Sequence, residues 1–121
     1  MGVYGRSKLA NILFTRELAR RLDGTAVTVN SLHPGAVRTG LGQNNDAPFM
    51  KLLVKLAQPF MRSPEKGAET SIWACSAPEL AKVSGRYFSD RREREPNAIA
   101  QDDDAAKRLW DVSARLVNLP A

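Results

Sequence analysis

Residues 7–35 of this 121-residue chain read SKLANILFTRELARRLDGTAVTVNSLHPG, and this stretch decides the fold class. From Ser7 to Leu22, apolar side chains recur at helical spacing, and no Pro or Gly interrupts them. Asp23-Gly24 is a pair suited to a left-handed helix end. The β-branched run over residues 26–32 predicts a buried strand, which His33-Pro34-Gly35 ends. A helix followed directly by such a strand is typical of an α/β fold.

The rest of the chain predicts more helices than a sheet of its own two strands can pack against. The predicted elements are a loop over 35–47, an amphipathic helix over 47–61 with a break at Pro59, a helix over 63–76, a strand over 85–89, a surface loop over 90–101 and a helix over 105–119. Two strands cannot bury the faces of four helices. The pattern therefore predicts part of a larger sheet.

Composition and charge narrow the function classes. The apolar stretches are too short and too interrupted to cross a bilayer, and residues 1–15 lack the long apolar core of a signal peptide, so we expect no membrane span and a cytoplasmic protein. The net charge of +5 suggests an acidic partner such as nucleic acid. However, the arginines over 16–21 share a helix with Glu17, and those over 90–95 alternate with acids. This pattern predicts a solvated mixed surface and no nucleic-acid partner.

Several residues that invite a special role receive ordinary interpretations. Cys75 is the only cysteine, which excludes an intramolecular disulfide, and its apolar neighbours predict a small buried side chain. His33, at a strand end before a proline, is interpreted as a structural polar residue. Trp73, Trp110 and Met61 are expected in the core or lining a pocket. No Cys/His cluster has metal-ligand spacing, so we expect no zinc site.

Tyr4 and Lys8 are the residues with clear chemical potential. They lie four positions apart at the start of the first predicted helix, which places both side chains on one face. A free phenol has a pKa of about 10, and a neighbouring cation lowers it. The pair could then pass a proton to or from an alcohol or a carbonyl.

Two short motifs stand in a fixed order along the chain. Residues 4–11, YGRSKLAN, resemble the active-site helix of the short-chain dehydrogenase/reductase family, including the small Ser7 before the lysine. Residues 30–39, NSLHPGAVRT, resemble its Pro-Gly-x-Val-x-Thr segment. Residues 65–70 and 84–88 also resemble the retinol-dehydrogenase-like branch. Two ordered motifs about thirty residues apart are much more specific than either one.

The resemblance implies a fold and an activity. The chain would form the C-terminal part of a Rossmann-type, doubly wound parallel sheet with flanking helices, and residues 1–121 would belong to a single domain. The implied activity is an oxidoreductase that transfers hydride between NAD(P)H and a small hydrophobic alcohol or carbonyl. The branch favours NADP over NAD as the cofactor.

The resemblance also implies site residues. Tyr4 would be the general acid/base, and Lys8 would bind the nicotinamide ribose and lower the pKa of Tyr4. These two would contact the cofactor together with the residues that shape the nicotinamide pocket, which are Pro34, Gly35, Val37 and Thr39. Gly35 has a physical reason to be small, because a planar ring must approach the backbone closely. Residues 40–47 and the helix after them would cover the substrate.

Part of the family pattern is expected to be missing. The Gly-rich pyrophosphate turn, an Asn-Asn-Ala-Gly-like strand end and a catalytic serine precede the tyrosine in that family, whereas Met1 is only three residues before Tyr4. We therefore expect the N-terminal dinucleotide-binding half to be absent and the isolated chain to be unstable and inactive. The alternative is a non-catalytic remnant that binds a partner through its first helix. That helix packs at subunit interfaces in the family, so a homo-oligomer is also among the expected assemblies.

Overall fold

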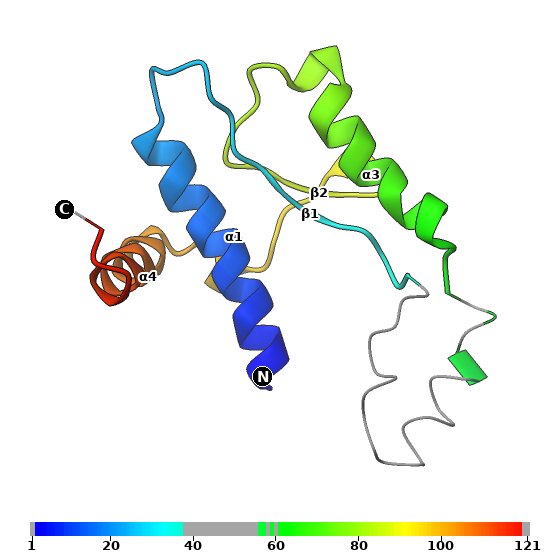
Figure 1. The fold of residues 1–121 in the computed structure, drawn as a ribbon, viewed down its shortest axis with the longest axis horizontal. Coiled ribbons are helices and arrows are strands. Elements are labelled where there is room, and N and C mark those ends of the chain that lie inside the picture. The colour runs from blue at the N-terminus through cyan, green and yellow to red at the C-terminus, as the bar shows by residue number, and fades with distance from the viewer. Residues whose placement is uncertain (1, 38–55, 58, 60, 120–121) are drawn as a thin grey trace.

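The computed structural model describes residues 2–37, 56–57, 59 and 61–119. The elements in chain order are α1 (Val3–Arg21), β1 (Ser31–His33), α3 (Pro64–Ser76), the 3-10 helix η2 (Pro78–Leu80), β2 (Tyr87–Ser89), β3 (Arg92–Glu93), the 3-10 helix η3 (Ala98–Gln101) and α4 (Asp103–Leu116). In Figure 1 the strands pass between α1 and α3, and α4 lies beside α1 on the side away from α3. The predicted loop over 35–47 and most of the predicted helix over 47–61 lie outside the described residues.

The three long helices confirm the predictions made from their local sequence. α1 begins at Val3, four residues before the expected start, so Tyr4 and Lys8 both belong to it. After its end, Gly24 adopts a φ of +79°, which is the left-handed geometry that the Asp23-Gly24 pair indicated. α3 follows the Ser63 cap, whose hydroxyl accepts a hydrogen bond from the Lys66 amide at 3.2 Å.

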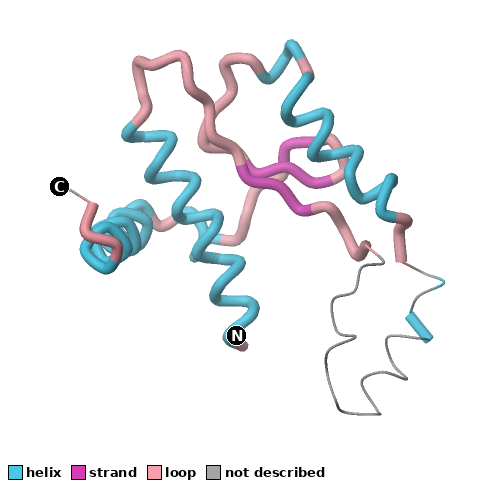
Figure 2. Tube along the Cα trace, viewed as in Figure 1, coloured by secondary structure: helices cyan, strands magenta, loops and turns pink. Residues whose placement is uncertain are grey.

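The sheet is small, as the strands in Figure 2 show, and it is mixed. β1 pairs in parallel with β2, with Leu32 opposite Phe88, and β2 pairs antiparallel with β3. The strand expected over 26–32 is regular only from Ser31, although Val29 still accepts a backbone hydrogen bond from Gly85 at 2.7 Å. Among the described residues β1 pairs with a strand on one side only. It therefore has few cross-strand hydrogen bonds, and its regular part is shorter than the predicted strand.

The segment expected to be a surface loop over 90–101 was predicted wrongly, because it contains β3 and η3. Asp90 and Arg91 both adopt a φ of 54°, the left-handed geometry of a tight hairpin turn, and this turn folds β3 back onto β2. The sequence carries no glycine at this turn, so the usual signal of such a hairpin is missing.

The described core is narrow. Its buried apolar residues are Leu13, Leu80, Phe88, Ala100 and Ala106, and Phe88 is the largest side chain that is fully buried. Trp73, which was expected in the core or lining a pocket, is half-buried and packs edge-on against Phe88 with ring centroids 5.4 Å apart, so it lies at the margin of this core. Large apolar side chains elsewhere are exposed, including Leu116 at 78% and Val3 at 76%. The core is therefore small for the number of helices, as the element pattern predicted.

Two residues depart from their predicted environments. Cys75 is exposed, although the sequence predicted a buried side chain. The reason is helical phase: Gly67 and Thr70 are buried on one side of α3, whereas Ile72 and Cys75 are exposed on another. Glu17 was expected on a solvated surface, yet its exposed fraction is only 2%.

A charged and aromatic contact joins α1 to α4. Glu17 accepts hydrogen bonds from Arg20 at 2.7 and 2.9 Å and from Arg21 at 2.7 Å. The guanidinium of Arg21 lies 4.6 Å from the Trp110 ring centroid, and Trp110 stacks on Phe14 at 5.5 Å. The Arg20 and Arg21 partners hold the pKa of Glu17 at about 2, below its ordinary 4.5, even though burial opposes this shift. These contacts fix α4 against α1.

Candidate active site

Tyr4 and Lys8 come together at the amino end of α1. The Lys8 Nζ atom lies 5.3 Å from the centroid of the Tyr4 ring, within the range of a cation–π contact. Both side chains are exposed, with Tyr4 at 63%. Ser7 lies between them in sequence, and its hydroxyl donates to the Tyr4 carbonyl at 2.8 Å. The first turns of α1 therefore present a phenol and an ammonium side by side to any molecule that approaches.

The Pro34–Val37 turn lies at the carboxyl end of β1. Gly35 has a φ of +85°, a conformation that residues with a β-carbon rarely adopt. A β-carbon on Gly35 would also lie 3.1 Å from three atoms of the Arg62 guanidinium. Glycine is thus required here by backbone geometry and by the Arg62 contact, whereas the close approach of a planar ring stays a prediction.

The amino end of α3 holds the other side of this turn. Val37 forms a parallel bridge with Arg62, and the Arg62 amide donates to the Ala36 carbonyl at 2.8 Å. A β-carbon on Gly67 would lie only 2.4 Å from a methyl carbon of Val37, so α3 can approach the turn only because residue 67 is glycine. The turn is therefore fixed by contacts with a helix about thirty residues further along the chain.

An ion pair closes the turn against the sheet. The Arg62 Nη1 atom pairs with the Asp90 carboxylate, which directly follows β2. Arg62 lowers the pKa of Asp90, with smaller contributions from Arg94 and His33, and Asp90 in turn raises the pKa of Arg62. His33 is the exposed last residue of β1. Its position at the strand end is near enough to Asp90 for the electrostatic contribution described above.

The predicted site residues thus form two groups. Tyr4 and Lys8 are in contact with each other, and Pro34, Gly35 and Val37 share one turn. No hydrogen bond or ion pair between described residues links the two groups, although the amino end of α1 and the carboxyl end of β1 lie on the same side of the molecule (Figure 1). Thr39 lies outside the described residues.

Sequence reasoning missed three residues that support the Pro34–Val37 turn, namely Arg62, Gly67 and Asp90. Each acts through a contact with a distant segment, so periodicity and local motifs carry no signal of it. The glycine in a helix at position 67 is the exception, because glycine in a helix interior costs stability and suggests a close approach.

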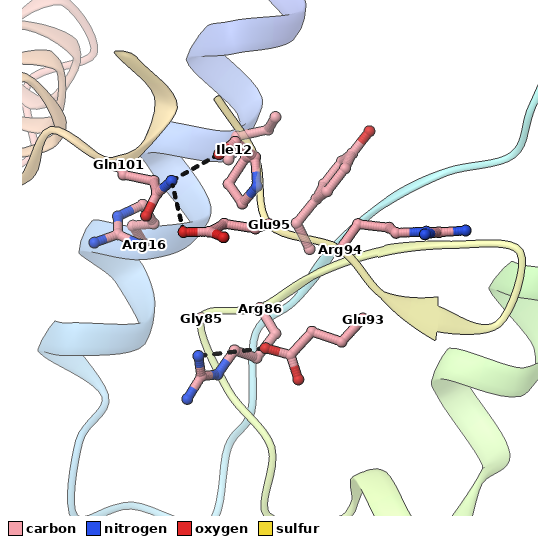
Figure 3. A pocket seen from close by; sticks show the side chains of 10 residues that line it. Ile12, Arg16, Gly85, Arg86, Glu93, Arg94, Glu95 and Gln101 are labelled. Carbon is pink, nitrogen blue, oxygen red and sulfur yellow. Dashed lines mark hydrogen bonds and ion pairs between the residues drawn. The ribbon is translucent and has the colours of Figure 1, made fainter. Parts of the chain in front are cut away.

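A concavity of about 280 Å³ lies elsewhere, between α1 and the β2–β3 hairpin (Figure 3). Two of its charged side chains, Arg86 and Glu93, form an ion pair at 3.3 Å, and the amide of Gln101 donates to Glu95 at 3.5 Å. None of the predicted site residues lines it. Among the described residues, no group of three or more His, Cys, Asp or Glu could hold a metal ion. Within the residues that the structure describes, no helix is long and apolar enough to span a membrane.

Comparison with known proteins identifies the family. Residues 1–48 match the family described as short chain dehydrogenase. The chain is also 55% identical over 118 residues to Retinol dehydrogenase 14 from Homo sapiens, an alignment that covers 96% of this chain and 35% of that protein. The chain belongs to the short-chain dehydrogenase family. Its similarity to the retinol-dehydrogenase-like branch extends to Retinol dehydrogenase 13 from Homo sapiens, at 46% identity over 98% of this chain and 37% of that protein.

A third relative in the branch is Retinol dehydrogenase 12 from Mus musculus, which is 44% identical over 96% of this chain and 36% of its own length. The chain thus spans about a third of the length of the curated relatives it matches. Membership in a short-chain dehydrogenase family implies a Rossmann-like α/β fold, with which the parallel β1–β2 pair is consistent.

Proposed function

We propose that this chain supplies the proton-transferring part of an NAD(P)-dependent oxidoreductase that interconverts a hydrophobic alcohol and the corresponding carbonyl compound. The observation that carries the proposal is the contact between Lys8 and Tyr4, with 5.3 Å from Nζ to the ring centroid, at an exposed helix end. Membership in the short-chain dehydrogenase family supports it.

In this mechanism Tyr4 moves the proton. During reduction its hydroxyl donates a proton to the carbonyl oxygen of the substrate, and during oxidation its oxygen accepts the proton of the alcohol. The Lys8 cation stabilises the phenolate form of Tyr4, because an opposite charge nearby favours the charged state. Ser7 holds the first turn of α1 through its hydrogen bond to the Tyr4 carbonyl.

The residues of this chain fit the nicotinamide part of a dinucleotide. The exposed ammonium of Lys8 and the hydroxyl of Tyr4 can donate hydrogen bonds to the hydroxyl groups of a sugar. The Pro34–Val37 turn lies at the carboxyl ends of the parallel strands, where α/β proteins bind such ligands. When bound, the cofactor supplies or accepts the hydride. Of the two forms of this cofactor we propose NADP, which is the preference that the resemblance implied.

The relatives also suggest the substrate class. Their names describe them as retinol dehydrogenases, so the alcohol is retinol in those proteins. For this chain we propose an apolar alcohol or aldehyde of the same chemical class. The residues expected to cover it, from 40 to 61, lie mostly outside the described part of the chain.

A chimera tests the proposal. The 118 aligned residues of human Retinol dehydrogenase 14 are replaced by those of this chain, and retinal reduction with NADPH is followed at 340 nm. Tyr4→Phe should lower kcat/KM by about 100-fold or more, the usual contribution of a general acid. Tyr87→Phe is the matched control, because Tyr87 is the other tyrosine of the chain and should leave kcat/KM unchanged.

The outcomes separate cleanly. Retention of NADPH binding by Tyr4→Phe, with loss of turnover, supports the proposal. Full activity of Tyr4→Phe would overturn it, as would an unmodified chimera that binds NADPH but does not reduce retinal. A chimera that does not fold would contradict the structural equivalence with the relatives. The alternative of a non-catalytic module that binds a partner through α1 predicts that Tyr4→Phe changes nothing.

A further inference from the structure

Arg62 connects three segments that lie far apart in the sequence. Its amide binds the Ala36 carbonyl at 2.8 Å, and its side chain pairs with Asp90. The Cζ, Nε and Nη1 atoms of its guanidinium each lie 3.1 Å from the position of a β-carbon on Gly35. Three equal distances place the face of the guanidinium, rather than one of its edges, against Gly35.

The bridge lies at the edge of the sheet where ligands bind in α/β proteins. Gly35 follows the end of β1 by two residues, and Asp90 follows the end of β2 directly. Because β1 and β2 are parallel, their carboxyl ends meet at one edge of the sheet. Arg62 therefore spans the two strand ends that border the proposed nicotinamide site.

Both ends of the bridge are held in constrained backbone geometry. Gly35 has a φ of +85°, and Asp90 has a φ of 54° in the tight turn between β2 and β3. A turn fixes the direction of the Asp90 carboxylate, and the planar, permanently charged guanidinium can face the carboxylate with one edge and Gly35 with its face. A lysine could satisfy the first contact only.

We propose that Arg62 is a positioning residue, which holds the Pro34–Val37 turn in the conformation that receives the nicotinamide. The inference deepens the proposed function and rests on it for the identity of the ligand. Arg62 and Asp90 are 37% and 47% exposed, so their ion pair contributes little to global stability. Loss of Arg62 should therefore loosen the turn far more than it destabilises the domain.

The test uses the chimera with two readouts. Hydrogen–deuterium exchange of a peptide containing Gly35, Ala36 and Val37 measures order in the turn without turnover, and steady-state kinetics give KM for NADPH and kcat. Arg62→Ala should speed exchange and raise KM by about tenfold each, with kcat within about threefold of the parent. Arg62→Lys, which keeps the charge but not the plane, should recover only part of the loss.

Arg86→Ala is the matched control. It removes another exposed arginine–carboxylate pair on the same hairpin, with Glu93 at 3.3 Å, but it does not touch the turn. Exchange and KM should stay at the parent values. The inference is overturned if Arg62→Ala leaves both readouts unchanged, if Arg62→Lys restores them fully, or if Arg86→Ala alters them equally.

Failure of this inference can be told apart from failure of the proposed function. If the unmodified chimera shows no turnover but the exchange contrast holds, the proposed chemistry fails and the structural role of Arg62 in the turn remains. If turnover depends on Tyr4 and the exchange contrast is absent, only the role of Arg62 fails.

Discussion

Replacing Glu17 should weaken the charged and aromatic contact that joins α1 to α4. It is 2% exposed and accepts three hydrogen bonds, two from Arg20 and one from Arg21. Glu17→Gln keeps the shape of the side chain but removes its charge. The two guanidinium groups, one of which also contacts Trp110, then lose their shared counterion.

The size of the effect follows from the pKa of Glu17. Arg20, with help from Arg21, lowers it from 4.5 to about 2. A shift of this size corresponds to at most about 3 kcal/mol. Arg20 is 62% exposed, so solvent screening reduces the expected loss to about 1–2 kcal/mol.

The same shift predicts a pH dependence with a definite sign. The pKa of Glu17 is lower in the folded chain than in the unfolded chain, so its stabilisation is complete above about 4.5 and is lost as the pH falls toward about 2. At pH 3, which lies between the two pKa values, only part of this stabilisation remains. The difference in unfolding free energy between the parent and Glu17→Gln should therefore be under half of its value at pH 7.

Urea unfolding of the chimera, followed by circular dichroism at pH 7, 5 and 3, measures this difference. Glu69→Gln is the control, since Glu69 pairs with Lys66 at 3.0 Å but is 39% exposed, and its loss should cost less than about 0.5 kcal/mol. Equal losses for the two variants at pH 7 would refute the reasoning. A Glu17→Gln difference that stayed constant down to pH 3 would refute it as well.

Three further predictions concern packing, exposure and capping. Gly67→Ala should destabilise the chimera by about 1–3 kcal/mol in urea unfolding, because its β-carbon would overlap Val37, and adding Val37→Ala should restore part of the loss. Cys75, the only thiol of the 121-residue chain, should react with a thiol reagent as fast in native buffer as in urea, and slow native labelling would contradict its exposure. Asp102→Ala should cost about 1 kcal/mol of thermal-unfolding stability, because its side chain accepts from the Ala105 amide at 2.8 Å, and Asp102→Asn should retain most of it.

Local sequence predicted the helices well because their signals lie within a few residues. α3 begins after the Ser63 cap and α4 after the Asp102 cap, close to the predicted helix starts at residues 63 and 105. Tyr4 and Lys8 were placed correctly on one helix face for the same reason, since a four-residue spacing on a helix determines the neighbourhood of two side chains.

The errors arose where a distant segment decides the environment. Glu17 looked like a surface acid, but it is only 2% exposed on the helix that packs against α4, about ninety residues later in the chain. β3 was missed because Asp90 and Arg91 form a left-handed turn without glycine. Cys75 has apolar neighbours in sequence, yet it lies on an exposed side of α3, apart from the buried Gly67 and Thr70.

The same distinction separates the two parts of the candidate site. The proton-transfer pair is local, because α1 alone brings Lys8 to Tyr4. The conformation of the turn around Gly35 does not depend on local sequence alone, because Arg62 and Asp90, which lie far from it in the sequence, hold it in place. Changes at Arg62 or Asp90 should therefore act on cofactor binding and leave the proton step largely intact, whereas replacement of Tyr4 by Phe should act on the proton step. Variants of Arg62 should then alter KM for the cofactor and variants of Tyr4 should alter kcat, and a combined variant should show the two effects multiplied, since the groups share no hydrogen bond or ion pair among the described residues.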